Sequence, residues 1–201
     1  MDVAPERLPR WLENFARRHG GSYAEEGLTV TAADGAVAVF EPPPGVAGVP
    51  DLDALRAAAT APRTLGLLLA RKGAVAAGVA DGAGLVASKV DTHYVQGRTA
   101  AGGWSQQRFA RRRDNQAKAA AADGAAIVGR VLLPRVRDLT ALVTGGDRAA
   151  VEAILTGREL APLTALRADR FLDVPEPRHA VLVAAIAGAR AVRVKVRDGP
   201  S

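Results

Sequence analysis

The sequence feature that most constrains the fold is a pair of apolar segments between residues 64 and 82, TLGLLLARKGAVAAGVADG. Each segment is long enough for a buried strand, and Lys72-Gly73 between them favours a tight turn. The next segment, GLVASKVDTHYVQ at 84–96, has the composition of a third strand. Three strands in succession predict a sheet that the rest of the chain must cover.

The segments on either side predict how that sheet is covered. Before it, residues 8–19 carry apolar side chains at helical spacing, and Asp34-Gly35 separates two short apolar stretches, as is typical of a hairpin. After it, a long helix is expected from Gln107 to about Leu133. A strand (LTALVTGG), a helix that Asp147 caps, a strand (LTALRADRFLDV), a helix and a last strand (AVRVKVR) should follow. Hairpins followed by alternating helices and strands predict an α/β fold with a mixed sheet and flanking helices.

The composition excludes several classes of protein. The 201 residues contain no cysteine, which removes disulfides and thiolate metal sites, and the three histidines are scattered. The longest apolar run, residues 180–189, is shorter than the roughly 20 residues that cross a bilayer. The first residues lack the pattern of a secretory signal. We therefore expect a cytoplasmic protein with no metal, no organic cofactor and no membrane contact.

Basic residues are concentrated in one segment of the chain. The net charge is +6, and between residues 98 and 118 the only acid is Asp114. The basic residues of this segment are Arg98, Arg108, Arg111, Arg112, Arg113 and Lys118. Such a cluster is typical of a surface that binds a polyanion, of which nucleic acid is the commonest. A solvated helix face without a partner is the alternative, and charge alone does not decide between the two.

A glycine-rich loop directly precedes the basic helix. Gly102-Gly103 allows the backbone to bend sharply, and the side chains that follow at the loop tip form hydrogen bonds that no core requires. Behind the tip, basic and amide residues recur at helical spacing on one face: Arg108, Arg111, Arg112, Asn115 and Lys118. The opposite face carries Phe109 and small residues that can pack on a sheet. The segment therefore predicts an amide-bearing tip on a basic helix.

The segment GGWSQQRFARRR resembles the catalytic loop of the archaeal and eukaryotic peptide-chain release factors. In that loop Gly-Gly-Gln is followed by Ser, two further residues and Arg-Phe-Ala-Arg. The matching residues here are Gly102, Gly103, Ser105, Arg108, Phe109, Ala110 and Arg111. In an ungapped comparison Trp104 stands at the position of the family's glutamine.

The same segment is also similar to the Vms-type release-factor-like peptidyl-tRNA hydrolases of ribosome quality control. Those enzymes carry Gly, two variable residues and then Gln, and Gly103 to Gln106 reproduces that spacing. The preceding THYVQGRTAAGG looks like the strand that leads into their loop. A composition rich in Ala and Arg and poor in Lys is compatible with an actinobacterial member.

This resemblance implies a fold and a set of site residues. The implied core is the ribonuclease H-like sheet of the release-factor catalytic domain at residues 61–201, with residues 1–60 as a helix-hairpin extension packed on it. The implied catalytic residues are Gln106, Gly102, Gly103 and Ser105, with Gln107 as the alternative glutamine. Trp104 is either an anchor that stiffens the tip or a solvent-facing substitution. The expected RNA-binding residues are Arg98, Arg108, Arg111, Arg112 and Lys118.

The implied function is hydrolysis of the ester between a nascent peptide and its tRNA on stalled or obstructed large ribosomal subunits. The expected partners are the large subunit, peptidyl-tRNA and ribosomal RNA, with neither DNA nor a membrane. The chain is too short to hold a stop-codon-reading domain beside this core, so we expect release without a stop codon. The alternative is a non-catalytic ribosome- or RNA-binding factor that uses the same basic helix.

Overall fold

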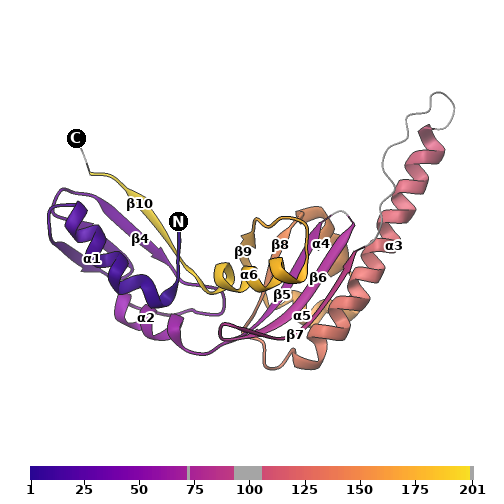
Figure 1. Ribbon diagram of the computed structural model, residues 1–201, viewed down its shortest axis with the longest axis horizontal. Coiled ribbons are helices and arrows are strands. Elements are labelled where there is room, and N and C mark those ends of the chain that lie inside the picture. The colour runs from indigo at the N-terminus through magenta and orange to yellow at the C-terminus, as the bar shows by residue number, and fades with distance from the viewer. Residues whose placement is uncertain (72, 93–105, 200–201) are drawn as a thin grey trace.

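The computed structural model describes residues 1–71, 73–92 and 106–199, and for residues 106–115 it describes the helix without the side chains. These residues form two five-stranded sheets at opposite ends of an elongated body (Figure 1). The strands are β1 (Asp2–Val3), β2 (Tyr23–Glu26), β3 (Thr29–Ala32), β4 (Val37–Glu41), β5 (Thr64–Arg71), β6 (Ala74–Asp81), β7 (Gly84–Thr92), β8 (Ala141–Gly146), β9 (Arg167–Leu172) and β10 (Val192–Arg197). The α-helices are α1 (Leu8–Arg18), α2 (Leu52–Thr60), α3 (Gln106–Leu132), α4 (Arg148–Leu155), α5 (Ala161–Thr164) and α6 (His179–Arg190).

The core sheet has the strand order β7-β6-β5-β8-β9. Strand β6 runs antiparallel to both neighbours, whereas β8 is parallel to β5 and to β9. This is the strand order and direction of a ribonuclease H-like sheet. The predicted α/β fold, with a mixed sheet and flanking helices, is confirmed.

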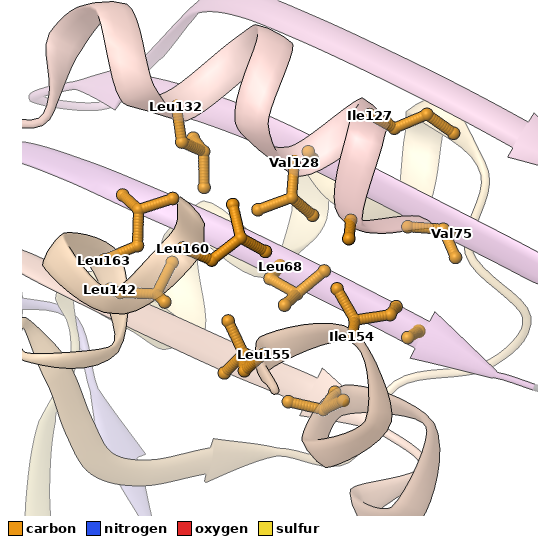
Figure 2. Packing of buried hydrophobic residues seen from close by; sticks show 14 of the residues in the cluster. Leu68, Val75, Ile127, Val128, Leu132, Leu142, Ile154, Leu155, Leu160 and Leu163 are labelled. Atoms are coloured by element: carbon orange, nitrogen blue, oxygen red, sulfur yellow. The ribbon is translucent and has the colours of Figure 1, made fainter. Parts of the chain in front are cut away.

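The two apolar segments between residues 64 and 82 are the adjacent strands β5 and β6 inside this sheet. In β5, residues 65 to 70 are all buried, and β6 is buried from Ala74 to Ala80. Strands that are covered on both faces read as continuous apolar runs, which explains the pattern in the sequence. Helices α3, α4 and α5 cover one face, shown in Figure 2, and α6 covers the other.

The second sheet, β1-β10-β4-β3-β2, is antiparallel throughout. Helices α1 and α2 cover one of its faces through buried residues that include Leu12, Phe15 and Leu55. The predicted hairpin is present as β3 and β4, with Gly35 at φ 83° in its turn. Neither β1 nor β2 was predicted, because both are short and mostly exposed.

Strand β10 belongs to this second sheet and lies between β1 and β4. The sequence predicted a strand here, and its register pairs Val194 with Phe40 of β4. The last strand of the chain is therefore hydrogen-bonded to strands of the first 60 residues. The division of the chain at residue 60 stays a prediction.

Two buried arginines lie where the chain passes between the sheets. Arg170 of β9, 8% exposed, donates to the carbonyl oxygens of Ala191, of Gly188 at 3.4 Å and of Pro42 at 3.4 Å. Arg63, before β5, donates to the carbonyl oxygens of Ala58 and Ala59 near the end of α2. Burial lowers the pKa of both guanidinium groups. Arg170 thus connects β9 of the core sheet to the residue before β10 and to the residue after β4.

Candidate functional site

Helix α3 carries part of the predicted site, and among its described side chains the buried ones lie in its C-terminal part. It has 27 residues, or about 40 Å of helix. Residues 116–119 are exposed at four successive positions, which together point to every side of the helix. From residue 116 onwards, where burial is described, the first buried position is Gly124. The N-terminal half of α3 therefore extends beyond the sheet, as Figure 1 shows.

The composition of α3 explains how this extension stays helical without a core to pack on. Five of the eight residues 116–123 are alanine. An unpacked helix depends on intrinsic propensity, and alanine has the highest of all residues. The extension is thus a helical arm with a small cross-section.

The packed half of α3 is fixed by close contacts with the sheet and with α4. Figure 2 shows Ile127, Val128 and Leu132 among the side chains of β5 and α4. A β-carbon on Gly124 would lie 2.8 Å from Cδ1 of Ile154 and 3.3 Å from Cγ2 of Val75. Only glycine lets the helix approach this closely.

The extension leaves the core at the carboxyl ends of the parallel strands. Gly124 contacts Val75 at the start of β6, and the neighbouring Ala74 pairs with Thr92, the last residue of β7. Because β5, β7 and β8 are mutually parallel, their carboxyl ends meet at this end of the sheet. Ligands of α/β sheets commonly bind there.

The structure places some of the predicted site residues and leaves others outside the described residues. Gln106 is the first residue of α3 and Gln107 the second, at the end of the helical arm that lies farthest from the sheet. Lys118 is exposed on the arm. Arg108, Arg111 and Arg112 lie within α3, between Gln106 and Lys118, and their predicted shared face falls on side chains outside the described ones. The predicted residues outside the described ranges are Arg98, Gly102, Gly103, Trp104 and Ser105.

A cleft that the sequence did not predict lies between α4 and β9. Its volume is about 280 Å³, and it is lined by Thr144, Arg148, Arg167, Ala168, Asp169 and Phe171. Cζ of Arg148 lies 4.2 Å from the centroid of the Phe171 ring. Nη1 of Arg167 lies 2.6 Å from Oε1 of Glu152, one helical turn along α4. No periodicity marks these residues, since tertiary packing alone brings them together.

Thr144 is the most unusual residue of this cleft. It is 1% exposed, and its hydroxyl has no hydrogen-bond partner among the described residues. The turn that follows it is tight: Gly146 has φ 98°, and a β-carbon there would lie 2.2 Å from the carbonyl oxygen of Ala70. Asp147 then caps α4 as predicted, accepting from the amides of Ala149 and Ala150.

The described part of the chain offers no metal site or membrane span. Within residues 1–71, 73–92 and 106–199, no group of three or more His, Cys, Asp or Glu residues is arranged to hold a metal ion. Among the helices of those same residues, none is both long enough and apolar enough to cross a bilayer.

Comparisons with known proteins agree with the expected similarity to release factors. Residues 63–195 match the family described as "Actinobacteria/chloroflexi VLRF1 release factor". The match spans the whole core sheet, α3 and most of β10. The chain belongs to this family, and the predicted resemblance to release-factor-like proteins is confirmed. It is a release-factor-like protein.

Two solved structures show weaker similarity. The crystal structure of the archaeal translation termination factor aRF1 has a TM-score of 0.45 and 16% identity, and the match covers 63% of this chain and 36% of that one. A structure described as "Archaeal protein" has a TM-score of 0.43 and 15% identity, covering 80% of this chain and 51% of that one. The chain thus spans about a third of the length of the first and about half of the length of the second. No curated protein matches.

Proposed function

We propose that the protein hydrolyses the ester of peptidyl-tRNA on stalled or obstructed large ribosomal subunits and so releases the nascent chain. One observation carries the proposal: in a member of a release-factor family, the helical arm that bears Gln106 at its tip is free of the core. A narrow arm suits a reaction centre walled by RNA. A core-packed helix would not reach into such a space.

The proposed chemistry needs positioning more than acid or base strength. The Gln106 amide is too weak a base to take a proton, but it can orient a water molecule towards the ester carbonyl. A backbone N–H of the tip donates to the oxyanion of the tetrahedral intermediate, and one such donor is worth roughly 10²–10³-fold in rate. The bond to the tRNA 3′ oxygen then breaks, and that oxygen takes up a proton that derives from the water. The products are a peptide carboxylate and a tRNA with a free 3′ hydroxyl.

The remaining tip residues have supporting roles in this proposal. Gly102 and Gly103 carry no side chain that would crowd the reaction centre, and Ser105 adds a hydrogen-bonding group beside Gln106. Trp104 anchors the tip by packing or stacking. Arg98, Arg108, Arg111, Arg112 and Lys118 bind phosphates of ribosomal RNA or tRNA and hold the arm in place.

The test is single-turnover release from purified large subunits that carry labelled peptidyl-tRNA, without messenger RNA. Gln106→Ala should lower the rate by about 10²–10³-fold at unchanged subunit binding, because only the transition-state interaction is lost. Gln107→Ala is the matched control and should be milder. A dead Gln107→Ala beside an active Gln106→Ala would transfer the role to Gln107. A strict need for a stop codon would refute codon independence.

A second candidate function is a non-catalytic ribosome- or RNA-binding factor. The observation that favours it is Trp104, which stands where an ungapped comparison expects the catalytic glutamine. This candidate predicts binding to large subunits with no release above background by the wild-type chain. Normal release by both glutamine variants would refute the glutamine mechanism instead.

A further inference from the structure

The cleft between α4 and β9 has the features of a site for a flat, neutral ligand. Cζ of Arg148 lies over the Phe171 ring, 4.2 Å from its centroid, and Arg148 is exposed, so the cleft offers a guanidinium and an aromatic ring side by side. Unpaired bases of RNA stack on aromatic rings and on arginine planes of this kind. The cleft, at about 280 Å³, is smaller than the pockets that enclose drug-sized ligands, so it suits a single ring system.

The charges around the cleft argue against a simple anion. The cations Arg148 and Arg167 are balanced by the carboxylates of Glu152 and Asp169, and Glu152 is already paired with Arg167. The N-terminus of α4 is not available either, because the Asp147 carboxylate accepts from its first free amides. A phosphate would therefore meet no net positive charge. A base edge carries both donors and acceptors, and it matches the guanidinium and carboxylate groups together.

The buried hydroxyl of Thr144 supplies the second, independent observation. Thr144 is 1% exposed, lines the cleft, and its Oγ1 has no partner within the described residues. A buried polar atom without a partner costs free energy, so such atoms are rare unless a ligand or water satisfies them. Arg148 is also a cation in the first turn of a helix, where the helix dipole disfavours it. The contact of Arg148 with the Phe171 ring offsets part of that cost, whereas nothing among the described residues satisfies the Thr144 hydroxyl.

We propose that this cleft binds one unpaired nucleobase of RNA. The base stacks on the Arg148–Phe171 pair, its edge bonds to Asp169 and Arg167, and the Thr144 hydroxyl bonds to a polar atom at the buried end. The cleft opens beside α4, whose first residue follows the carboxyl end of β8, so it lies at the end of the sheet from which the helical arm extends. This inference rests on the proposed contact of the protein with ribosomal RNA or tRNA, and it assigns a specific pocket to that contact.

The test uses the full chain and single-stranded hexaribonucleotides with 2-aminopurine at one internal position. Stacking quenches the fluorescence of this base, so binding in the cleft should lower it. Arg148→Ala should weaken binding at least about fivefold, the lower end expected for loss of one stacking partner. Arg137→Ala is the matched control, an exposed arginine ahead of the opposite end of β8, and should bind as the wild type does.

A second variant guards against loss of folding. Thr144→Val keeps the shape of the side chain and removes the unpartnered hydroxyl, so the melting temperature should stay the same or rise while binding weakens. Wild-type quenching in both Arg148→Ala and Thr144→Val would overturn the proposal. If free AMP, GMP, CMP or UMP bound as tightly as the hexaribonucleotide, RNA would not be the occupant. If inorganic phosphate displaced the hexaribonucleotide completely, the cleft would not recognise a base.

This result is separable from the proposed hydrolysis. Gln106→Ala should quench 2-aminopurine as the wild type does, since the tip is not part of the cleft. If a Gln106 variant loses peptide release but quenches normally, the tip is affected and the base site is not. Normal release without quenching in the wild type overturns the base site and leaves the hydrolase proposal intact.

Discussion

Gly124 of α3 lies directly against Ile154 of α4, so closely that a β-carbon on the glycine would be 2.8 Å from Cδ1 of the isoleucine. Gly124 is also the first buried residue of α3 from residue 116 onwards, the part of the helix whose burial is described. It marks the boundary between the helical arm and the part of the helix that belongs to the core. The position of the arm therefore depends on this packing.

The first prediction compares two glycines of the same helix. Gly129→Ala should raise the free energy of unfolding by about 0.5–1 kcal/mol, because its β-carbon would meet Leu133 at an ordinary 3.5 Å and alanine favours a helix. Gly124→Ala should lower it by about 1 kcal/mol, because overpacking costs about 1–3 kcal/mol and exceeds that gain. Urea unfolding measures both. Equal stabilisation by the two variants would show that the Ile154 contact relaxes freely.

The second prediction concerns the length of the arm. Removing residues 116–122, none of which is buried, withdraws the tip by about 10 Å and keeps its direction within about 20°. Peptide release from large subunits should be abolished while thermal stability stays close to that of the wild type. Gln116→Ala at full length is the control and should release normally. Release at the wild-type rate by the shortened chain would contradict a role for reach.

The third prediction concerns the basic face of α3. Arg111→Glu with Arg112→Glu should weaken binding to large subunits and reduce the slope of log K against log salt concentration by about 1 for each lost phosphate contact. Filter binding over a series of salt concentrations measures the slope. Arg135→Glu, exposed beyond the other end of α3, should leave the slope unchanged. An unchanged slope in the double variant would place the RNA contacts elsewhere.

The fourth prediction concerns the buried cation between the sheets. Arg170→Met should lower the free energy of unfolding by about 2–3 kcal/mol, because it leaves the carbonyl groups of Ala191 and Pro42 without this donor. Arg178→Met is the control, since its partner Glu176 is 3.4 Å away and both are exposed. Similar losses in the two variants would mean that Arg170 contributes no more than a surface residue.

The fifth prediction concerns pH. A backbone hydrogen bond and the Arg190 guanidinium, with Nη2 2.6 Å from Oε1, hold the pKa of Glu6 below its ordinary value of 4.5. The ionised form is therefore favoured in the folded protein. Its contribution to stability is present above pH 4.5 and is lost as the pH falls through the lower, folded-state value.

Glu6→Gln should accordingly make the melting temperature fall less steeply on acidification than it does in the wild type. Arg190→Met removes one of the two causes and should have the same effect to a smaller extent. Thermal unfolding at a series of pH values from neutral to acidic measures the difference. Parallel curves for wild type and Glu6→Gln would refute the coupling.

Local patterns predicted much of the fold. The Asp147 cap, the turn at Gly35 and the long helix that ends before Pro134 follow from residue types at fixed spacing, and the structure contains all three. The placement of β10 did not follow, because an alternating strand such as VRVKVR carries no mark of the sheet that it joins. Only its pairing with β4 decides that.

Of the two candidate sites, one could be predicted from the sequence and the other could not. The tip and its basic helix could be recognised because their residues are contiguous in the sequence. The cleft could not, since it depends on how β8 and β9 pair, and that register shifts between Leu142 and Thr144. In the sequence, Arg170 looks like an exposed charged residue of a polar strand. It is buried only because the two sheets pack around it.

The position of β10 has a consequence for synthesis of the protein. Strand β1 is made first, yet its partner in the sheet is β10, which leaves the ribosome nearly two hundred residues later. All strands of the core sheet have been made once β9 has emerged, whereas the partner of β1 follows only after α6. If strands pair as they emerge from the ribosome, we expect the second sheet to be completed after the core sheet.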